Sequence, residues 1–464
     1  MSMHRKESGR ILTKALILIV LAGGLGFLAL AAFRAGPAPQ IAAEPDGGSI
    51  GRKKTVTVTV TEPARGLSRV RAELVQGDRV EKLTEKTYAP PPTWSFGGAG
   101  TGRETLALEI GRDAIKGLKG GTATLRVTAE GTPSWLRPAA SASKEVSFQV
   151  RLTPPSLGVI STFHYSKQGG AEAVVYRVGE SNVRDGVQAG DAWFPGFPLP
   201  GGGKEDRFAL FAVPHDMADS SSVKLTAADD AGNESQVTFI DQFTVRRPIE
   251  GTINLSDAFL NKVVPAIMSQ TPEMSDAGGL LENFLSINRD LRKANAAALV
   301  ELASGSKPQF LWSKPFLPMP NAKVMAPFAE KRTYVYQGRA VDHQVHLGYD
   351  LAATRAVPIP ASNDGVVAMS RYFGIYGNTV VVDHGYGLQS LYAHLSSIDV
   401  KEGQEVKRGD TLGRTGDTGL AGGDHLHFSI LVAGQPVNPQ EWWDAHWIRD
   451  RVARKLDGAF RFEE

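Results

Sequence analysis

The sequence predicts a mainly β, multidomain protein with two β-sandwich domains, a short helical segment and a C-terminal antiparallel β domain. The length of 464 residues predicts about three folded units, because domains average roughly 150 residues. Apolar and polar residues alternate in many short runs separated by Gly, Pro and Ser clusters, which is the pattern of half-buried strands. Helical spacing of apolar residues is found in one internal window. Hydrophobic residues make up 42% of the chain, which is enough for each unit to form a core.

The N-terminal residues predict a membrane anchor at residues 1–34. Ala15–Phe33 is an uncharged stretch of 19 residues, close to the roughly 20 helical residues that cross a hydrocarbon core. Four basic residues precede it, Arg5, Lys6, Arg10 and Lys14, and they predict a cytoplasmic N-terminus with the remaining chain outside. The alternative is a cleaved signal peptide, because Ala29-Leu30-Ala31 has the small-residue form of a cleavage site. Both interpretations export the chain.

Residues 35–52 are rich in Pro, Gly and Ala and predict a flexible linker. Residues 53–153 predict the first β-sandwich. Thr55–Thr61 alternates Thr and Val, so one face of this strand is apolar and the other hydroxylic. Further strands of the same kind are expected at Thr105–Ile110, Ala123–Ala129 and Val146–Leu152.

Residues 154–248 predict a second β-sandwich, which begins after Pro154-Pro155. Its strands are expected at Ala173–Val178, Phe208–Val213, Val223–Ala227 and Gln236–Ile240. Val223–Asn233 resembles the strand-and-turn ending of bacterial immunoglobulin-like domains. Neither β-domain shows a catalytic constellation, so we expect both to act as spacers or docking surfaces.

Residues 249–308 predict a helical connector. Leu280, Phe284, Ile287 and Leu291 are spaced four, three and four apart along one helix face, with Ser275 or Asp276 as a candidate N-cap. Packing of this face on a neighbouring domain is favoured over a cofactor or partner groove. From residue 309 to 445 the chain returns to short strands and glycine turns, and residues 446–464 are expected to form a C-terminal tail.

Composition excludes several classes of site. The chain has no cysteine, so disulfides, thiolate metal sites and cysteine nucleophiles are excluded, and any metal must be bound by His and carboxylates. The formal net charge of +2 is spread without a run of like charges, so nothing indicates nucleic acid as a partner.

Histidines cluster near the C-terminus. Seven of the ten lie between His343 and His446. His346 precedes Asp350 by four residues, and Gly348 between them favours a loop entering a strand over a helix. His425 and His427 are two apart on a strand-like run, so both imidazoles face the same way. His394 ends another strand-like run.

This set of side chains fits hydrolytic zinc chemistry. Catalytic zinc takes three protein ligands from His and carboxylates and leaves a fourth position for water. Two imidazoles and a carboxylate meet that need, and the ion lowers the pKa of water from 15.7 toward about 7 and polarises a carbonyl. Two further histidines nearby could take a proton and stabilise an oxyanion.

Residues 309–444 resemble the lysostaphin-like zinc endopeptidases that cleave peptidoglycan. The motifs are His346-x-x-x-Asp350, Tyr392-x-His394-Leu395 and His425-Leu426-His427-Phe428, in that order, with Val400–Gly413 and Val382–Gly385 also similar. The resemblance implies that Zn²⁺ is held by His346, Asp350 and His427, and that His394 and His425 are catalytic. The chain departs from the family at Gly422-Gly423-Asp424, where a small residue or Pro is usual, and it lacks the long coiled coil of many relatives.

Other aromatic and histidine residues are expected to be structural. His343 is expected to be exposed or to lie outside the ligand set, and His384 is expected to brace a turn. Trp442, Trp443 and Trp447 are expected to pack at the C-terminal edge, with a sugar-binding cleft as the alternative.

The resulting hypothesis is a zinc metalloendopeptidase that hydrolyses peptide cross-links of peptidoglycan, anchored by one helix in the inner membrane with its domains in the periplasm or extracytoplasmic space. Its partners would be peptidoglycan peptide stems and, through the β-domains, an envelope protein. The alternative is a non-catalytic envelope protein that binds peptidoglycan or activates other wall hydrolases. A lipoyl-type carrier is disfavoured, because Lys401 and Lys407 lack the expected setting.

Overall fold

The computed structural model describes residues 4–92 and 100–464 and divides into two compact units. The first unit comprises Met1–Pro154 and Asp229–Asn233, and the second comprises Pro155–Ala228 and Glu234–Glu464. The predicted anchor at 1–34 includes residues 1–3, and the predicted β-domain at 53–153 includes residues 93–99, both outside the described residues. The side chains of residues 4–10, 30 and 31 also lie outside them, among them the predicted basic flank at Arg5, Lys6 and Arg10.

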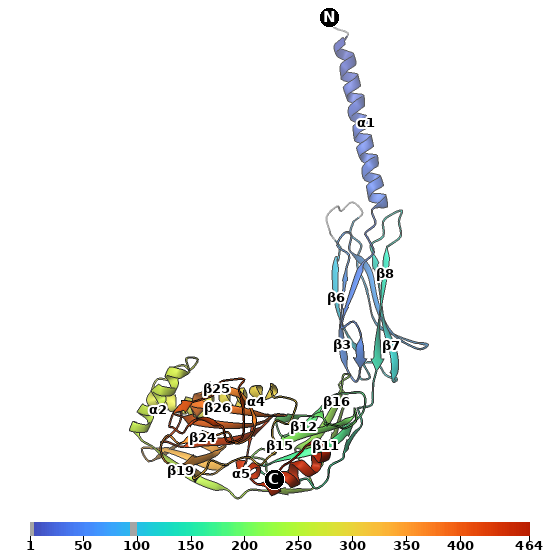
Figure 1. Ribbon diagram of the computed structural model, residues 1–464. Helices are drawn as coiled ribbons and strands as arrows, with labels where there is room; N and C mark the ends of the chain where they lie inside the picture. Colours follow the sequence, from blue (N-terminus) through green and yellow to red (C-terminus); the bar gives the residue numbers. More distant parts are fainter. Residues whose placement is uncertain (1–3, 93–99) are drawn as a thin grey trace. The chain divides into compact units, whose positions relative to one another are not determined.

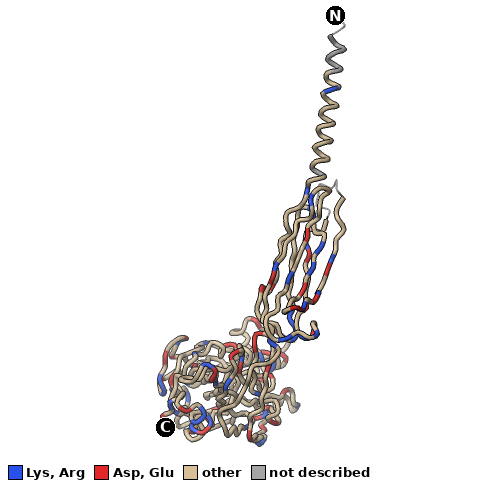
Figure 2. The backbone as a smooth tube through the Cα atoms, turned by 90° about the vertical axis from the view of Figure 1, so that its right-hand side faces the viewer, with Lys and Arg blue, Asp and Glu red and all other residues tan. Residues whose placement is uncertain are grey.

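A single long helix, α1 (His4–Phe33), opens the first unit (Figure 1). Its window Ile11–Ala29 has 19 residues and a mean hydropathy of 2.3, so it is long and apolar enough to cross a membrane. The side chains in this window are exposed, and Figure 2 shows the helix mostly tan. The window starts four residues before the predicted stretch and includes Lys14, whose long side chain can extend toward a membrane surface. A membrane anchor and a signal sequence both fit this helix.

The first β-domain, residues 40–150, consists of two sheets that enclose one core. The smaller sheet has the order β1 (Gln40–Glu44), β3 (Lys54–Thr61), β6 (Arg103–Ile110), with antiparallel pairing. The larger sheet has the order β2 (Gly48–Ile50), β8 (Ser141–Val150), β7 (Gly121–Gly131), β4 (Leu67–Gln76), β5 (Arg79–Thr87), in which β2 pairs in parallel and the others pair antiparallel.

The alternation of apolar and polar residues along the strands explains this core. Val56, Val58 and Val60 of β3 are fully buried while the intervening threonines face outward, as the sequence predicts. Residues 35–52, predicted as a flexible linker, instead contain β1 and β2. The prediction was wrong because β1 and β2 are edge strands, and an edge strand can pair with its sheet although it has few apolar residues. Ala43 and Ile50 bury their side chains in this core.

The second β-domain, residues 157–244, begins the second unit and again has two main sheets. One has the order β14 (Phe197–Pro198), β15 (Asp206–Ala212), β11 (Ala171–Val178), β9 (Leu157–Val159). The other has the order β13 (Ala192–Pro195), β12 (Asn182–Ala189), β16 (Val223–Asp229), β17 (Glu234–Val237), and a short parallel pair joins β10 (Tyr165–Lys167) and β18 (Gln242–Thr244). The four predicted strands coincide with β11, β15, β16 and β17 within a few residues. The immunoglobulin-like topology stays a prediction.

The helical segment, residues 249–304, begins with a strand. Its elements are β19 (Ile249–Leu255), α2 (Asp257–Gln270), α3 (Leu280–Ser286), η1 (Ile287–Leu291) and α4 (Arg292–Ser304). Phe284 and Ile287 are fully buried, and the Phe284 ring lies 5.8 Å from that of Tyr334, which confirms packing of the predicted face on a neighbouring domain. The N-cap prediction was wrong: Gly279 precedes α3, while the Asp276 carboxylate accepts hydrogen bonds from the Gly278 backbone and the Asn283 side chain.

The C-terminal β-domain, residues 323–437, is built on a large antiparallel sheet. Its order is β20 (Lys323–Ala326), β23 (Tyr349–Ala352), β31 (Leu426–Val432), β27 (Leu388–Leu395), β26 (Asn378–Gly385), β25 (Gly365–Tyr372), β29 (Glu405–Val406), and β32 (Gln435–Val437) also pairs with β31. The domain also has two small sheets. One has the order β24 (Pro358–Pro360), β30 (Thr411–Arg414), β28 (Ser397–Ile398). The other has the order β19, β21 (Glu330–Tyr336), β22 (Arg339–His346). One turn of 3₁₀-helix, η2 (Gly374–Tyr376), precedes β26.

The chain ends in short helices: α5 (Pro439–Trp443), α6 (Ala445–Ile448), η3 (Arg449–Ala453), α7 (Arg454–Leu456) and η4 (Asp457–Ala459). The tail prediction for residues 446–464 was therefore wrong. Ile448, Val452, Leu456 and Phe460 are four residues apart and buried, which is the face of a packed helical stretch. They belong to one core with both β-domains of the second unit. Trp442 is buried in the same core, as predicted.

Candidate metal centre and surrounding cleft

Three strands bring the predicted ligand residues together. His346 ends β22, Asp350 follows in β23, and the antiparallel register places Asp350 opposite His427 of β31. Gly348 lies in the turn between the first two strands. A Cβ atom there would lie 2.6 Å from the His427 ring and from the Ser429 hydroxyl, so the close approach of these strands requires glycine.

The ligand atoms of these three residues fit one ion. His346 Nε2 lies 2.9 Å from Asp350 Oδ1 and 3.0 Å from His427 Nδ1, and His427 Nδ1 lies 3.1 Å from the same oxygen. Ligands bound to one tetrahedral zinc at 2.0–2.2 Å stand about 3.3–3.6 Å apart. The three atoms lie a few tenths of an ångström closer than that, so a small outward shift would let them share one ion, and zinc accepts two imidazoles and a carboxylate as ligands.

Hydrogen bonds on the remote atoms fix each ligand. His346 Nδ1 donates to the Pro327 carbonyl at 3.1 Å, which leaves the Nε2 lone pair facing the centre. The Ser429 hydroxyl donates to the Leu347 carbonyl at 2.8 Å and so accepts from His427 Nε2 at 3.1 Å, which leaves the Nδ1 lone pair free.

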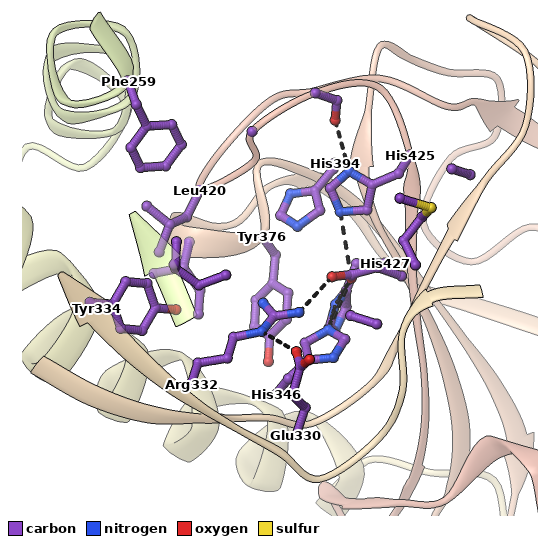
Figure 3. Close-up of a pocket in the computed structure, with 18 of the residues that line it drawn as sticks. Phe259, Glu330, Arg332, Tyr334, His346, Tyr376, His394, Leu420, His425 and His427 are labelled. Atoms are coloured by element: carbon purple, nitrogen blue, oxygen red, sulfur yellow. Dashed lines mark hydrogen bonds and ion pairs between the residues drawn. The ribbon is translucent and has the colours of Figure 1, made fainter. Parts of the chain in front are cut away.

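Asp350 is oriented by a cation. Arg332 of β21 donates from Nη2 to Asp350 Oδ2 at 2.8 Å. Its Nε donates to Glu330 at 2.8 Å (Figure 3). The guanidinium thus holds one carboxylate oxygen and leaves Oδ1 toward the imidazoles.

His394 and His425 lie beside the ligand set, as the motif order predicts. Their ring centroids are 4.9 Å apart, and the His394 ring is 5.8 Å from that of His427. His394 Nδ1 donates to the Thr418 carbonyl at 2.8 Å, and His425 Nδ1 donates to the Gly423 carbonyl at 2.7 Å. In both rings Nε2 is therefore the nitrogen available for proton transfer. His394 has a backbone φ of 65°, an unusual conformation for a residue other than glycine.

Burial and neighbouring groups shift the pKa values of four residues of the site. Burial would raise the pKa of Asp350, but the neighbouring rings of His346, His425 and His427 outweigh it and hold the pKa well below 3.8. Burial lowers the pKa of His427 to about 4, and burial together with the neighbouring histidines holds the pKa of His394 well below 6.5. Burial lowers the pKa of His425, but Asp350 outweighs it, so the net pKa is raised.

A cleft of about 590 Å³ opens onto these residues. Figure 3 shows His394, His425 and His427 on one side and Phe259, Tyr334 and Leu420 across the opening. The helical segment forms one wall, and β20 and the loop before His425 form others. The lining residues include Asn254, Phe259, Arg292, Met325 and Asp424. Asp424, the departure from the family pattern, lines this cleft and accepts from the Ala356 backbone at 3.2 Å.

A second cavity of about 640 Å³ shares Arg292, His346, Tyr376 and His427 with this cleft. Its other lining residues include Asp216 and Asp219 of the second β-domain. The β-domain therefore contributes to the surroundings of the candidate metal centre.

His343 and His384 lie where the sequence predicts. His343 is exposed and pairs with the Thr333 hydroxyl at 3.2 Å. His384 is fully buried and bridges the Asp364 carbonyl and the Ser390 hydroxyl, both at 2.7 Å. Sequence reasoning missed Arg332, Tyr376 and Ser429. Ser429 could have been found, because it is two residues beyond His427 on the same strand face, whereas no local signal marks Arg332.

Comparisons with known proteins agree with this geometry. Residues 344–439 match the model of peptidase family M23, so the chain contains an M23 peptidase domain, which confirms the resemblance. The DD-carboxypeptidase/endopeptidase Mpg of Neisseria meningitidis is 38% identical over 124 residues, 26% of this chain and 27% of that protein. The peptidoglycan DD-endopeptidase ShyA of Vibrio cholerae is 40% identical over 116 residues, 25% and 26% of the two chains. The match thus spans about a quarter of these curated relatives.

Among solved structures, a crystal structure of a peptidase M23 from Pseudomonas aeruginosa aligns with a TM-score of 0.35 and 22% identity. The alignment covers 58% of this chain and 92% of that one.

Proposed function

We propose that the chain is a zinc-dependent endopeptidase that hydrolyses peptide cross-links of peptidoglycan outside the cytoplasm. The observation that carries this proposal is the meeting of His346 Nε2, Asp350 Oδ1 and His427 Nδ1 within 2.9–3.1 Å at the base of an open cleft. The M23 domain and the names of its relatives support the same reaction class.

His346, Asp350 and His427 are the proposed ligands of Zn²⁺, each held by its own hydrogen-bond partner on the remote atom. Bound zinc supplies Lewis-acid polarisation of a carbonyl and lowers the pKa of water toward about 7. Two neutral imidazoles and one carboxylate would leave the zinc site with one net positive charge, which would attract a substrate carbonyl.

His394 and His425 are the proposed catalytic histidines. Each has its Nδ1 proton committed to a backbone carbonyl, so each can accept or deliver a proton only at Nε2. We propose that His394 accepts a proton at Nε2 and that His425 donates from Nε2 toward a developing negative charge.

The proposed substrate bond joins D-amino acids, because the relatives ShyA and Mpg are named DD-endopeptidases. A glycine bridge is the alternative. Arg292 lines the cleft with its Nε and Nη2 bound to Asn288, and it is the proposed partner of a carboxylate of the peptide stem.

We propose that α1 anchors the chain in the inner membrane with the domains on the outer side, because its apolar window has the length of a single span. The two β-domains would then act as spacers, or as docking surfaces for an envelope protein.

The test is digestion of purified sacculi by the full chain in detergent, with the soluble products identified by mass spectrometry. Asp350→Ala should lose both bound zinc and hydrolysis, and His394→Ala should retain zinc and lose hydrolysis. His343→Ala is the matched control, because this exposed histidine is three residues from His346 and should keep both properties.

A protein that binds sacculi without releasing peptides would support the alternative of a non-catalytic wall-binding or activating protein. Full zinc occupancy in Asp350→Ala would contradict the ligand assignment.

A further inference from the structure

The loop that connects β7 and β8 exposes two large apolar side chains. Within this loop, residues 132–140 and hereafter the Trp135 loop, Trp135 is 79% exposed and Leu136 is 57% exposed. They are the central residues of a closed turn: Ser134 N donates to Arg137 O at 3.0 Å, and Arg137 N donates to Ser134 Oγ at 3.1 Å. Such positions usually hold Gly, Asn, Asp or Pro, so Trp and Leu there indicate an apolar partner.

The base of the Trp135 loop is fixed to the sandwich. Gly131 N donates to the Ala140 carbonyl at 2.8 Å and continues the β7–β8 ladder to the foot of the loop. Thr132 is buried and its hydroxyl donates to the Gly66 carbonyl at 2.9 Å. The exposure of Trp135 and Leu136 is therefore a property of a braced turn.

The same turn contacts the end of α1. Leu136 N and Ser134 Oγ both donate to the Ala32 carbonyl at 2.9 Å, so the loop satisfies a carbonyl that the helix terminus leaves open. The Arg137 guanidinium lies 6.0 Å from the centre of the Phe33 ring.

These contacts define the depth of the loop relative to a bilayer. The apolar window of α1 ends at Ala29, and Ala32 is three residues further, about 4.5 Å along a helix. The headgroup layer on each side of the hydrocarbon core is roughly 5–8 Å thick. A loop hydrogen-bonded to Ala32 thus lies in that layer, where Trp is favoured and where Arg meets lipid phosphates.

We propose that the Trp135 loop is a lipid contact that docks the first β-domain on the outer surface of the membrane that α1 crosses. Trp135 and Leu136 enter the boundary between headgroups and acyl chains, and Arg137 binds headgroup phosphates. The inference rests on the proposed membrane span of α1 and is independent of the peptidase site.

The absence of cysteine makes a site-specific test direct. Trp135→Cys, Leu136→Cys, Val80→Cys and Val20→Cys would each carry an environment-sensitive fluorophore in the full chain. The chains would be placed in vesicles of phosphatidylethanolamine and phosphatidylglycerol with nitroxide-labelled lipid as quencher, at shallow or deep positions.

Val80 is the matched control. Val80 is 53% exposed and lies in the same sheet, but at the end away from the Trp135 loop. At the loop end, Leu67 of β4 pairs with Gly131. At the far end, Val75 of β4 pairs with both Val80 and Thr124. The two ends are about 25 Å apart at the rise of a strand. Val20, 67% exposed in the middle of the apolar window, reports the span itself.

The shallow quencher should reduce the fluorescence of probes at positions 135 and 136 severalfold more than that of the probe at position 80. The deep quencher should reduce the fluorescence of the probe at position 20. If the probe at position 20 is quenched but those at 135 and 136 are quenched no more than the one at 80, the proposed docking is wrong and the proposed membrane span is supported. A blue-shifted but unquenched probe at 135 would overturn it in favour of a protein contact. No quenching at 20 would overturn the span and the docking together.

Discussion

Each imidazole near the candidate metal centre is bound by a different partner on the nitrogen remote from it. Backbone carbonyls hold His346, His394 and His425, and the Ser429 hydroxyl holds His427. The four rings therefore need no change of tautomer to bind a cation or accept a proton. Such pre-organisation stabilises charge without reorganisation during a reaction.

Arg332→Gln should weaken metal binding. The substitution removes the cation that binds Asp350 Oδ2 at 2.8 Å and leaves this nearly buried carboxylate free to rotate. Loss of such an outer partner costs about 10- to 100-fold in metal affinity or activity. Competition with a chelator measures the affinity, and release of peptides from sacculi measures the activity. Arg339→Gln is the control, because Arg339 is exposed at the far end of the same hairpin; equal values for the two variants would rule out a positioning role for Arg332.

Substitutions at His394 should separate catalysis from backbone strain. His394→Ala and His394→Gly should both retain metal and lose hydrolysis. The glycine variant should be more stable by about 1 kcal/mol, because alanine at a φ of 65° keeps the steric cost that glycine lacks. Urea unfolding of the two variants measures this difference. If the alanine variant is as stable as the glycine variant, the left-handed conformation at this position is not maintained.

The candidate site was predictable from sequence at the level of residue pairs that share a strand or a short loop. His425 and His427 share a face because of strand periodicity, and His346 and Asp350 are joined by a glycine turn. Arg332 was not predictable, because its approach to Asp350 depends on the pairing of β21 with β22, which no local pattern specifies. The proposed roles of all five predicted residues await the tests above.

The helical segment is an integral part of the cleft. β19 pairs in parallel with β21, the strand that carries Glu330 and Arg332, and α2 places Phe259 across the opening from the histidines (Figure 3). Ser256 caps α2 by accepting from the Phe259 backbone at 3.2 Å. The orientation of this wall therefore depends on packing between the helices and β21.

Phe284→Ala should destabilise the second unit and loosen this wall. Phe284 is fully buried between α2 and Tyr334, and truncation of a buried Phe costs about 3–5 kcal/mol. Urea unfolding should show the loss, and the KM for sacculus fragments should rise more than kcat falls. Val300→Ala, at a 43% exposed position on α4, should change neither quantity much. A stability loss without any effect on KM would show that the wall does not position substrate.

Element predictions succeeded where periodicity was strong. The alternating run at residues 55–61 is β3, and the face with Phe284 and Ile287 is buried. The linker and tail predictions were wrong for one reason: residues 40–50 and 446–464 gain their structure from a neighbouring core, to which Ile50, Val452 and Leu456 contribute. Composition alone does not report that context.

On the scale of the second unit, one core joins the second β-domain, the C-terminal β-domain and the C-terminal helices. Phe208 of β15 packs against Tyr386 with ring centroids 4.9 Å apart, and Lys455 and Glu172 form a buried ion pair between α7 and β11. The second β-domain therefore stabilises the scaffold of the candidate site directly, which a division into independent modules would not predict.

Glu441 lies at the same junction and links its stability to pH. It is buried at the start of α5, and its Oε2 accepts from Ala171 N of β11 at 3.0 Å. Burial raises its pKa from 4.5 to about 8. Between these values the unfolded chain has released a proton that the folded chain retains. The free energy of unfolding therefore falls as pH rises through this window, by up to roughly 5 kcal/mol.

Glu441→Gln should remove this dependence, because the amide stays neutral and its oxygen can still accept from Ala171 N. The variant should match the wild type at about pH 3.5 and below, where the carboxyl is mostly protonated in both states, and exceed it near pH 8. Urea unfolding across this range measures both curves, with Glu301→Gln at an exposed helical position as the control. Parallel curves for wild type and Glu441→Gln would mean that Glu441 ionises in the folded protein at its ordinary pKa, which requires water or a cation to reach the junction between the two β-domains.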